Sequence, residues 1–278
     1  MTTQQPMGFH DYKAGYGPLD PLSHAVSQRD NQVMDMVKEA LDLNRGALAY
    51  QPVMKSQNTK QVAFFEGLIR LSDGTGLIIP AKEFIEVVED MELGRRIDCL
   101  ALELGLRSLV AEPKLRLSIN MSARSIGYRK WMQTLEQGLA GHEHIADRLI
   151  LEITETSAMS MPELVISFMK DMQKRGISFA LDDFGAGQTS FRYLRDFFFD
   201  ILKIDGQFTK NLAQNPDNQV LMQALGSIAN HFEMFTVAEN VESAEDAQLL
   251  IAMGIDCLQG YHFGAPSVTP PWAHKSAR

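Results

Sequence analysis

The stretch RLILEITETSAMSMPELVISFMKDMQKRGISFALDD, at residues 148–183, contains the pattern that decides the fold. An apolar run at Arg148–Thr154 is followed by a helical pattern at Met161–Arg175 and by a second apolar run at Ile177–Asp183. Short apolar runs on either side of an amphipathic helix predict a β–α–β unit, in which the two strands run parallel and the helix covers the sheet.

The same alternation continues towards both ends of the chain. Six further apolar runs predict strands near Ala47–Val53, Val62–Arg70, Leu115–Met121, Asp200–Asp205, Glu233–Glu239 and Ile255–Tyr261. Helical patterns separate most of these runs, at Ala81–Met91, Gly94–Val110, Phe208–Asn230 and Ala244–Met253. Eight strands that alternate with helices indicate an α/β protein built as a TIM-like (β/α)8 barrel.

One connection departs from this scheme. The link between the first two predicted strands, Met54–Gln61, is about eight residues long, whereas a parallel crossover needs roughly a dozen or more. We therefore expect a hairpin here, with the first strand antiparallel to the rest of the barrel.

The two ends of the chain lack the regular pattern. Residues 1–28 are rich in Gly, Pro, Gln and Asp, so we expect a flexible N-terminal tail. We expect the barrel domain at residues 29–268, opening with an amphipathic helix at about Asp30–Leu43. Residues 269–278 are expected to form a C-terminal tail that frays.

Composition narrows the class of protein. With 278 residues, 45% of them hydrophobic, the chain is long enough for one barrel domain. The formal net charge of -9 argues against a nucleic-acid polymer as partner, because such partners require basic surfaces. Two isolated cysteines, no secretory leader and no apolar run of membrane-spanning length predict a cytoplasmic protein without membrane insertion.

Polar side chains gather at the ends of the predicted strands. In chain order they are Glu66, Asn120, Glu152, Glu155, Asp182, Asp183, Lys203, Asp205, Glu239 and Gln259. Because such strand ends converge on one mouth of a barrel, the carboxylates would repel one another unless cations or protons intervene. Oxygen-rich ligand sets favour hard ions, so this pattern predicts a cage for two divalent cations, Mg2+ or Mn2+.

Seven motifs in order resemble those of EAL-domain proteins. FFEGLIRL (64–71) is similar to the signature segment of that family, with Gly67 where alanine is usual. The later motifs are LSINMSARS (117–125), LILEITET (149–156), LDDFGAGQTSFRYL (181–194), ILKID (201–205), VAENVES (237–243) and LQGYHFGAP (258–266). The resemblance runs from about Leu43 to Pro266. It implies a barrel with a reversed first strand and an enzyme, a metal-dependent phosphodiesterase that opens cyclic di-GMP to linear pGpG.

The resemblance also implies ligands for the two cations. One cation would be held by Glu66, Asn120, Glu152 and Asp182. The second would be held by Asp182, Asp183 and Glu239, so that Asp182 bridges the pair.

Further roles are implied for catalysis and substrate binding. Lys203 would orient the attacking water. Glu155 would brace the DDFG loop, where Gly185 and Gly187 would permit tight turns. The expected catalytic residues are Lys203, Glu155 and Glu239. The substrate would be contacted by Arg70, Asp205, Gln259 and Glu242. Family members often dimerise, so a homodimer through the face near the DDFG loop is expected.

Several of these residues also allow a structural interpretation. Asp182 and Asp183 can form an Asx turn, and Lys203 could instead form a Schiff base. Asp205 can pair with Lys203, and Glu242 can be an exposed cap of the next helix. The run Phe197–Phe199 suits the core or a dimer contact.

Three departures from the family pattern bear on activity. Phe64 stands where a small residue is usual, Gly67 lacks a methyl group, and Asn240 replaces a glycine after Glu239. Phe64 and Gly67 can compensate for each other in volume or can shift Glu66. Asn240 tolerates a left-handed backbone better than most residues. The rival functions are a cyclic di-GMP receptor without turnover and a protein-interaction scaffold.

Overall fold

Eight strands close into a ring in the computed structural model, which describes residues 21–187 and 194–273. The ring consists of β1 (Gly46–Lys55), β2 (Asn58–Ser72), β4 (Leu117–Asn120), β5 (Leu149–Thr154), β6 (Ser178–Phe184), β7 (Ile201–Ile204), β8 (Phe235–Ala238) and β9 (Cys257–Gln259). The predicted barrel and its predicted strands are confirmed, because β1 pairs with both β2 and β9 and thereby joins the two ends of the sheet.

The first strand is reversed, as the short link predicts. β1 runs antiparallel to β2 and to β9, whereas β2 and the following strands pair in parallel. Only Ser56 and Gln57 separate β1 from β2, so the turn is tighter than expected. The short strand β3 (Ile78–Pro80), which the sequence did not predict, pairs antiparallel with β2 outside the ring.

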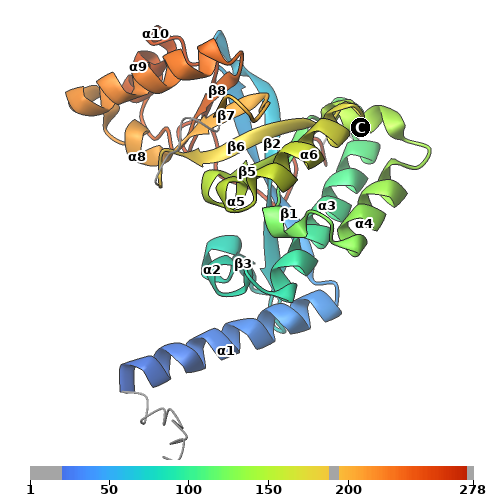
Figure 1. Cartoon of the computed structure of the whole chain (residues 1–278). Helices are drawn as coiled ribbons and strands as arrows, with labels where there is room; N and C mark the ends of the chain where they lie inside the picture. The colour runs from blue at the N-terminus through green and yellow to red at the C-terminus, as the bar shows by residue number, and fades with distance from the viewer. Residues whose placement is uncertain (1–20, 188–193, 274–278) are drawn as a thin grey trace, which may run out of the picture.

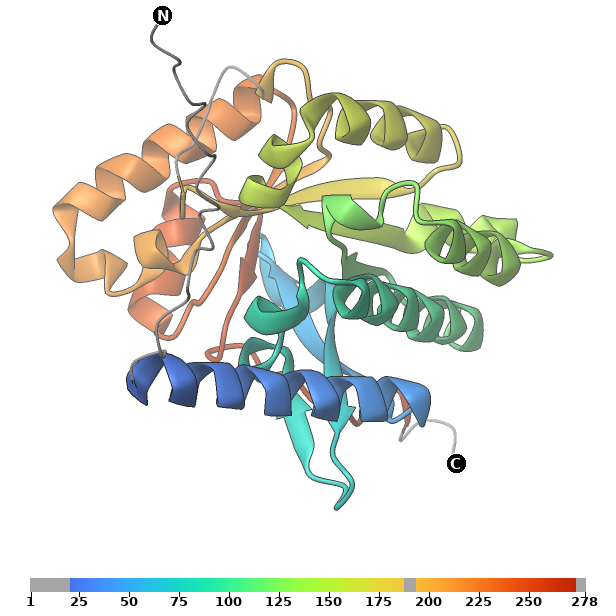
Figure 2. The ribbon, with the colours of Figure 1, turned by 60° about the horizontal axis from the view of Figure 1, so that its bottom comes forward.

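Helices surround the ring of strands, and Figure 2 shows them from teal to orange around the central strands. The longer ones are α1 (Pro21–Asp42), α3 (Glu92–Ala111), α4 (Arg129–Leu139), α6 (Pro162–Gln173), α9 (Pro216–His231) and α10 (Ala244–Ala252). The shorter ones are α2 (Ile85–Val88), α5 (Glu155–Ser160) and α8 (Gly206–Thr209), with 3-10 turns at η1 (Ala81–Glu83), η2 (Ala123–Ser125), η3 (Glu143–Arg148) and η4 (Leu212–Gln214). Figure 1 labels most of these elements.

Two expected helices are broken in the structure. The pattern at Ala81–Met91 forms η1 and α2, and the pattern at Phe208–Asn230 forms α8, η4 and α9. The second break has a local cause: Asn211 adopts a left-handed backbone with φ 52°, and Pro216 starts α9 because it lacks the N–H that an interior position requires. Helix α4, which the sequence pattern did not single out, packs on α3.

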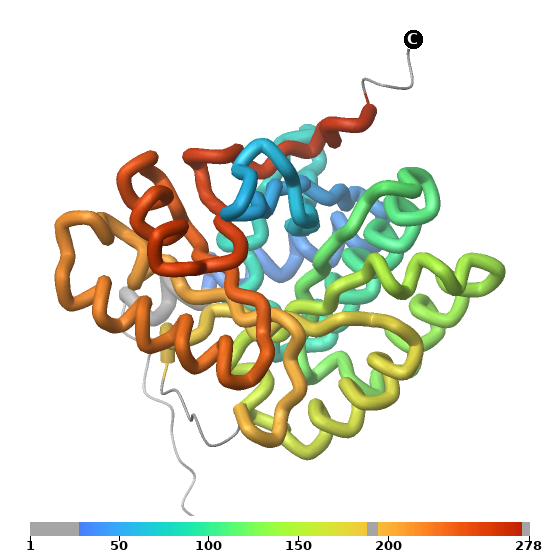
Figure 3. Tube along the Cα trace, turned by 90° about the horizontal axis from the view of Figure 1, so that it is seen from above, coloured from blue at the N-terminus to red at the C-terminus, as the bar shows by residue number. Residues whose placement is uncertain are grey.

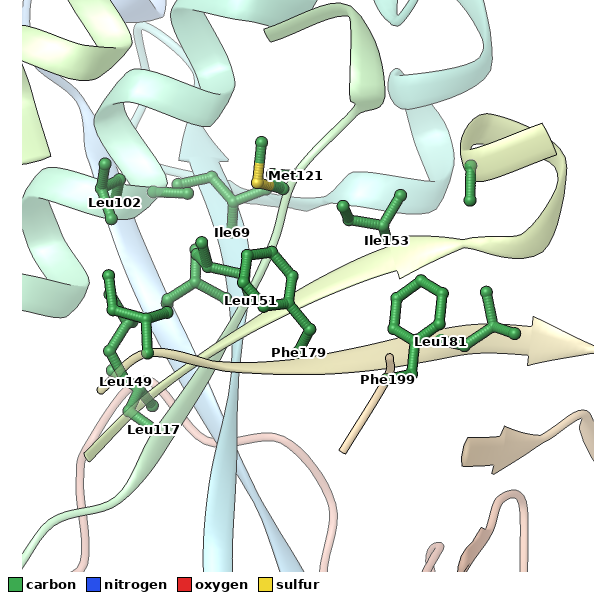
Figure 4. Packing of buried hydrophobic residues seen from close by; sticks show 14 of the residues in the cluster. Ile69, Leu102, Leu117, Met121, Leu149, Leu151, Ile153, Phe179, Leu181 and Phe199 are labelled. Carbon is green, nitrogen blue, oxygen red and sulfur yellow. The ribbon is translucent and has the colours of Figure 1, made fainter. Parts of the chain in front are cut away.

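The core lies mainly between the strands and the surrounding helices. Figure 4 shows Leu117, Leu149, Leu151, Phe179 and others packed there, all of them buried. A second, smaller cluster fills one end of the barrel interior and consists of Val53, Phe64, Ile150, Ala180, Ile201 and Val237. Because side chains alternate along a strand, the residues two positions further along also face the interior. Glu66, Glu152, Asp182, Lys203 and Glu239 occupy these positions.

Both ends of the described chain pack on the barrel more than the sequence predicts. Helix α1 begins at Pro21, earlier than the expected Asp30, and contacts α3. The expected C-terminal tail docks as far as Trp272, whose ring lies 4.9 Å from that of Tyr50 and 5.3 Å from that of Phe65. Figure 3 shows the red C-terminal segment beside the light-blue β1–β2 hairpin. Within the described residues no helix has both the length and the apolar character to span a bilayer.

Candidate active site

The predicted polar residues meet at one end of the barrel, around the buried amine of Lys203. Its Nζ lies 2.7 Å from Glu152 Oε2, 2.8 Å from Asp182 Oδ1, 2.9 Å from Glu239 Oε1 and 3.5 Å from Glu66 Oε2. Glu66 from the middle of β2 and carboxylates from β5, β6 and the end of β8 thus surround one ammonium group. Lys203 is 0% exposed, so water does not reach these ion pairs. Charges attract one another more strongly in such a buried site than in water.

Glu66 is held by amide donors as well as by Lys203. Asn120 Nδ2 donates to Glu66 Oε1 at 2.9 Å, and Gln259 Nε2 donates to Glu66 Oε2 at 2.6 Å. Burial alone would raise the pKa of Glu66, but the Lys203 charge and the amides of Gln259 and Asn120 outweigh it and hold that pKa below its usual value. Glu66 therefore stays ionised in a buried site.

The other carboxylates lie where negative charge is in excess. Burial, with Glu66 and Asp182 nearby, raises the pKa of Glu152 well above its usual value. Burial and Asp182 raise the pKa of Glu239 to about 8, against the opposing effect of Lys203, and the pKa of Asp183 to about 6. One ammonium group does not balance so many carboxylates, and additional positive charge is required for all of them to be ionised.

The donor set fits divalent cations. Carboxylate oxygens of Glu66, Glu152 and Asp182 lie within 4.8 Å of one another, and so do those of Asp182, Asp183 and Glu239. The two groups share Asp182. Glu152 Oε1 is buried and has no hydrogen-bond partner among the described residues, so one acceptor oxygen of this group is unpaired. Oxygen ligands of this kind suit Mg2+ or Mn2+.

Comparison with known proteins identifies the family of the chain. The family model described as "EAL domain" matches residues 34–266. This chain belongs to the EAL domain family. It is 31% identical over 234 residues to the cyclic di-GMP phosphodiesterase PdeB of Shewanella oneidensis, covering 83% of this chain and 27% of the relative. It is 29% identical over 238 residues to the cyclic di-GMP phosphodiesterase PdeF of Escherichia coli, covering 84% and 32%. The chain thus spans about a third or less of the length of these relatives.

Solved structures of EAL domains share the fold. The PaMucR phosphodiesterase in complex with c-di-GMP matches with a TM-score of 0.74 at 25% identity, covering 85% of this chain and 97% of that one. The EAL domain of FimX from Pseudomonas aeruginosa, bound to c-di-GMP, matches with a TM-score of 0.78 at 23% identity over the same shares. The second likeness supports the fold of this EAL domain alone.

The DDFG loop of this EAL domain is held from two sides. Buried Glu155 accepts a hydrogen bond from the Gly185 N–H at 3.1 Å, and Gln207 Nε2 donates to the Gly185 carbonyl oxygen at 2.8 Å. Gly185 has φ 92°, and a Cβ there would lie 2.5 Å from the Phe208 ring, so glycine is required. Gly187, also expected in a tight turn, does not adopt a positive φ. Residues 188–193 of the loop lie outside the described residues.

The expected substrate residues occupy different positions. Arg70 lies four residues beyond Glu66 on β2, where burial lowers its pKa and Glu66 and Tyr261 oppose that shift. Asp205 caps α8 by accepting a hydrogen bond from the Gln207 N–H at 2.8 Å. It is not among the ion-pair partners of Lys203, so the interpretation of Asp205 and Lys203 as an ion pair is wrong. Exposed Glu242 lines a hollow with Lys210 and Tyr261, while Ser243, not Glu242, caps α10.

The packing bears on two further interpretations, those of Lys203 and of the phenylalanine run. The pKa of Lys203 lies well above its usual value, because the surrounding carboxylates outweigh burial, so the amine is not the free base that a Schiff base needs. In the phenylalanine run, Phe197 and Phe199 are buried and Phe198 is 61% exposed.

The three departures act at different places. Phe64 packs in the small cluster at the far end of the barrel, whereas a Cβ on Gly67 would lie 2.8 Å from Ile119 Cδ1 in the main core. The side chains at positions 64 and 67 therefore occupy different spaces, and the prediction that Phe64 compensates for the missing methyl group of Gly67 is wrong. Asn240 does adopt the left-handed backbone, with φ 51°.

Gln51 belongs to this site although the sequence interpretation missed it. On β1 it stands opposite Glu66, and its Oε1 accepts from Gln259 Nε2 at 3.2 Å while its Nε2 donates to the Gly264 carbonyl oxygen at 3.2 Å. It is the one amide in the apolar run Ala47–Val53, and that signal was available in the sequence.

Proposed function

We propose that this EAL domain hydrolyses cyclic di-GMP to linear pGpG with the help of two divalent cations, Mg2+ or Mn2+. The observation that carries the proposal is that two clusters of three carboxylate residues share Asp182, which lies beside the buried Lys203. Curated relatives with this domain are named cyclic di-GMP phosphodiesterases, which supports the choice of substrate.

We assign the residues of the candidate active site to two groups, cation ligands and substrate contacts. Glu66, Asn120, Glu152 and Asp182 would hold one cation, and Asp182, Asp183 and Glu239 the other. When bound, such a pair supplies an activated water and offsets charge on the attacking and leaving oxygens. Arg70, Asp205, Glu242 and Gln259 are proposed to contact the dinucleotide, with the guanidinium of Arg70 on a phosphate.

Lys203 and Glu155 have positioning roles in this proposal. Lys203 gathers the carboxylates of Glu152, Asp182 and Glu239 from inside the barrel and orients the attacking water. Glu155 fixes Gly185 and thereby sets the backbone next to Asp183. The chain thus pre-organises charge before the substrate arrives, which is the main requirement of phosphoryl transfer.

The wider setting is also part of the proposal. The domain expected at 29–268 is proposed to be extended by the start of α1 at Pro21 and by the docked segment up to Trp272, and to dimerise through the face near the DDFG loop. Free cysteines at Cys99 and Cys257 are in keeping with a reducing compartment, and we propose a cytoplasmic location.

The test is an assay with cyclic di-GMP and Mn2+ or Mg2+, with chromatography of the products. We expect pGpG from the unchanged protein and none from Glu66→Ala or Asp182→Ala, with circular dichroism to show that both variants fold. Lys203→Ala should lower kcat more than it raises KM. Binding of cyclic di-GMP without turnover would identify a receptor, and neither binding nor turnover would indicate a scaffold. Full activity in either carboxylate variant would show that the cation ligands are misassigned.

A further inference from the structure

A second hollow lies at the end of the barrel opposite the carboxylates. Ile150, Ile201 and Phe235 line it from the first residues of β5, β7 and β8, and Arg116 lines it from the position before β4. The strand ends that carry the candidate active site point the other way. The hollow has a volume of about 520 Å3, within the range of roughly 300–1,000 Å3 in which small-molecule sites fall.

The floor of this hollow is apolar. Phe64, Ile150, Ile201 and Val237 face the barrel interior there and are 0–8% exposed. At the rim, Phe235 is 65% exposed, so the apolar surface continues out to solvent. Covering the exposed part of Phe235 with an aliphatic or aromatic group would be favourable by about 25 cal/mol per Å2.

The rim adds positive charge. Lys55 and Arg116 line the hollow, and no carboxylate of the described residues forms an ion pair with either of them. Asp256, the one acidic lining residue in the described chain, already accepts from the Thr236 N–H at 2.9 Å and from Thr236 Oγ1 at 2.8 Å. Two cations therefore remain available at this mouth of a protein whose formal net charge is -9.

We propose that this hollow binds a small amphiphilic anion, with its carboxylate at Lys55 and Arg116 and its aliphatic chain over Ile201 and the exposed ring of Phe235. Arg and Lys donors form the stronger, charge-assisted hydrogen bonds to a carboxylate. The apolar floor holds the chain and the cationic rim selects the head group. This inference stands apart from the proposed function, because it uses none of the residues of the candidate active site.

The experiment is calorimetric titration of the full chain with octanoate, kept below its micelle concentration and without divalent cations or cyclic dinucleotide. We expect saturable binding at one site, about tenfold weaker in the Lys55→Gln/Arg116→Gln double variant. The matched control, Lys38→Gln/Arg129→Gln, removes two exposed cations outside the hollow and should bind as the unchanged protein does. Thermal melts check that each variant is folded.

Two further measurements test the head group and the location. Octan-1-ol has the same chain without the charge and should bind about tenfold more weakly than octanoate. Octanoate at saturation should slow alkylation of half-buried Cys257 on the wall of the hollow, read by mass spectrometry. The proposal is overturned by absence of saturable binding, by equal affinity in the double variant, by equal affinity for the alcohol, or by unchanged alkylation of Cys257.

Discussion

At the scale of single residues, Gln51 links the last strand of the barrel to Glu66. Its amide connects the Gly264 carbonyl to Gln259, which in turn donates to Glu66. A residue that orients the carboxylate of a proposed metal ligand in this way typically affects activity by about 10–100-fold when it is removed.

Gln51→Ala is therefore expected to lower kcat on cyclic di-GMP by about 10–100-fold. The reason is that Gln259 loses the acceptor that fixes its amide towards Glu66. The readout is kcat and KM measured across a range of Mn2+ concentrations, since a misplaced Glu66 should also raise the Mn2+ needed. Gln57→Ala, at an exposed turn of the same hairpin, is the matched control. Unchanged kinetics in Gln51→Ala would show that Glu66 is fixed without it.

A buried acid on α3 predicts a pH dependence of stability. Burial raises the pKa of Asp98 to about 7, although it accepts hydrogen bonds from Ser125 Oγ at 2.5 Å and from the Ser122 N–H at 3.0 Å. The folded chain then keeps a proton that the unfolded chain releases near pH 4, so this group makes stability fall as pH rises from about 4 to 7.

Asp98→Asn should remove the contribution of Asp98 to the fall in stability with rising pH. Its amide is neutral at every pH and retains an oxygen for Ser122 and Ser125, so the free energy of unfolding should become flatter between pH 4 and 7. Urea unfolding at several pH values measures this, with the exposed Asp35→Asn as control. An equal pH slope in Asp98→Asn and the unchanged protein would contradict the prediction.

At the scale of elements, the close contact of β2 with β4 explains Gly67. A Cβ at this position would meet Ile119 Cδ1 at 2.8 Å, Leu48 Cδ1 at 3.3 Å and the Ser118 carbonyl oxygen at 3.3 Å. Ile119 therefore occupies part of the space that a methyl group at position 67 would need.

Gly67→Ala should thus destabilise this protein even though it restores the usual residue of the family. We expect a loss of about 1–3 kcal/mol from overpacking. Urea unfolding gives the value, and Gly74→Ala, where the nearest atom would be the Arg45 side chain at 3.6 Å, should cost less. A more stable Gly67→Ala variant would mean that Ile119 moves aside without strain.

The sequence predicted most of the elements because period-two and helical patterns report burial directly. It predicted the site residues as a set because strand ends of a barrel converge, and the structure brings Glu66, Glu152, Asp182 and Lys203 together. It did not predict the break before Pro216 or the role of Gln51. The break has local causes, the left-handed Asn211 and the start of α9 at Pro216, which the helical pattern does not contain. The lone amide of Gln51 is visible in the sequence, but its role depends on contacts with Gln259 and Gly264, which lie far along the chain.

At the scale of the whole molecule, the C-terminal segment from Ser267 to Trp272 packs on the β1–β2 hairpin, whose strand β1 closes the ring. Trp272 packs edge-on against Tyr50 and Phe65, and Ser267 pairs with Tyr50 through the backbone. The segment therefore covers the outer side of β1 and β2.

Trp272→Ala should lower the free energy of unfolding by about 1–3 kcal/mol, because two aromatic contacts and part of the buried area are lost. Thermal and urea unfolding measure the change, and Trp272→Phe, which keeps a ring at this place, should recover most of it. A Trp272→Ala variant as stable as the unchanged protein would show that the segment rests on the hairpin without supporting it.

The pairing of β1 with β9 has a consequence for synthesis on the ribosome. The outer edge of β1 has no β9 neighbour until Cys257–Gln259 have emerged from the ribosome. Closure also needs a contact between segments about 200 residues apart, and such long-range contacts make folding slow. Nascent chains halted before residue 257 should hence present an open edge to other chains and should be cleaved by protease faster than chains that extend past β9.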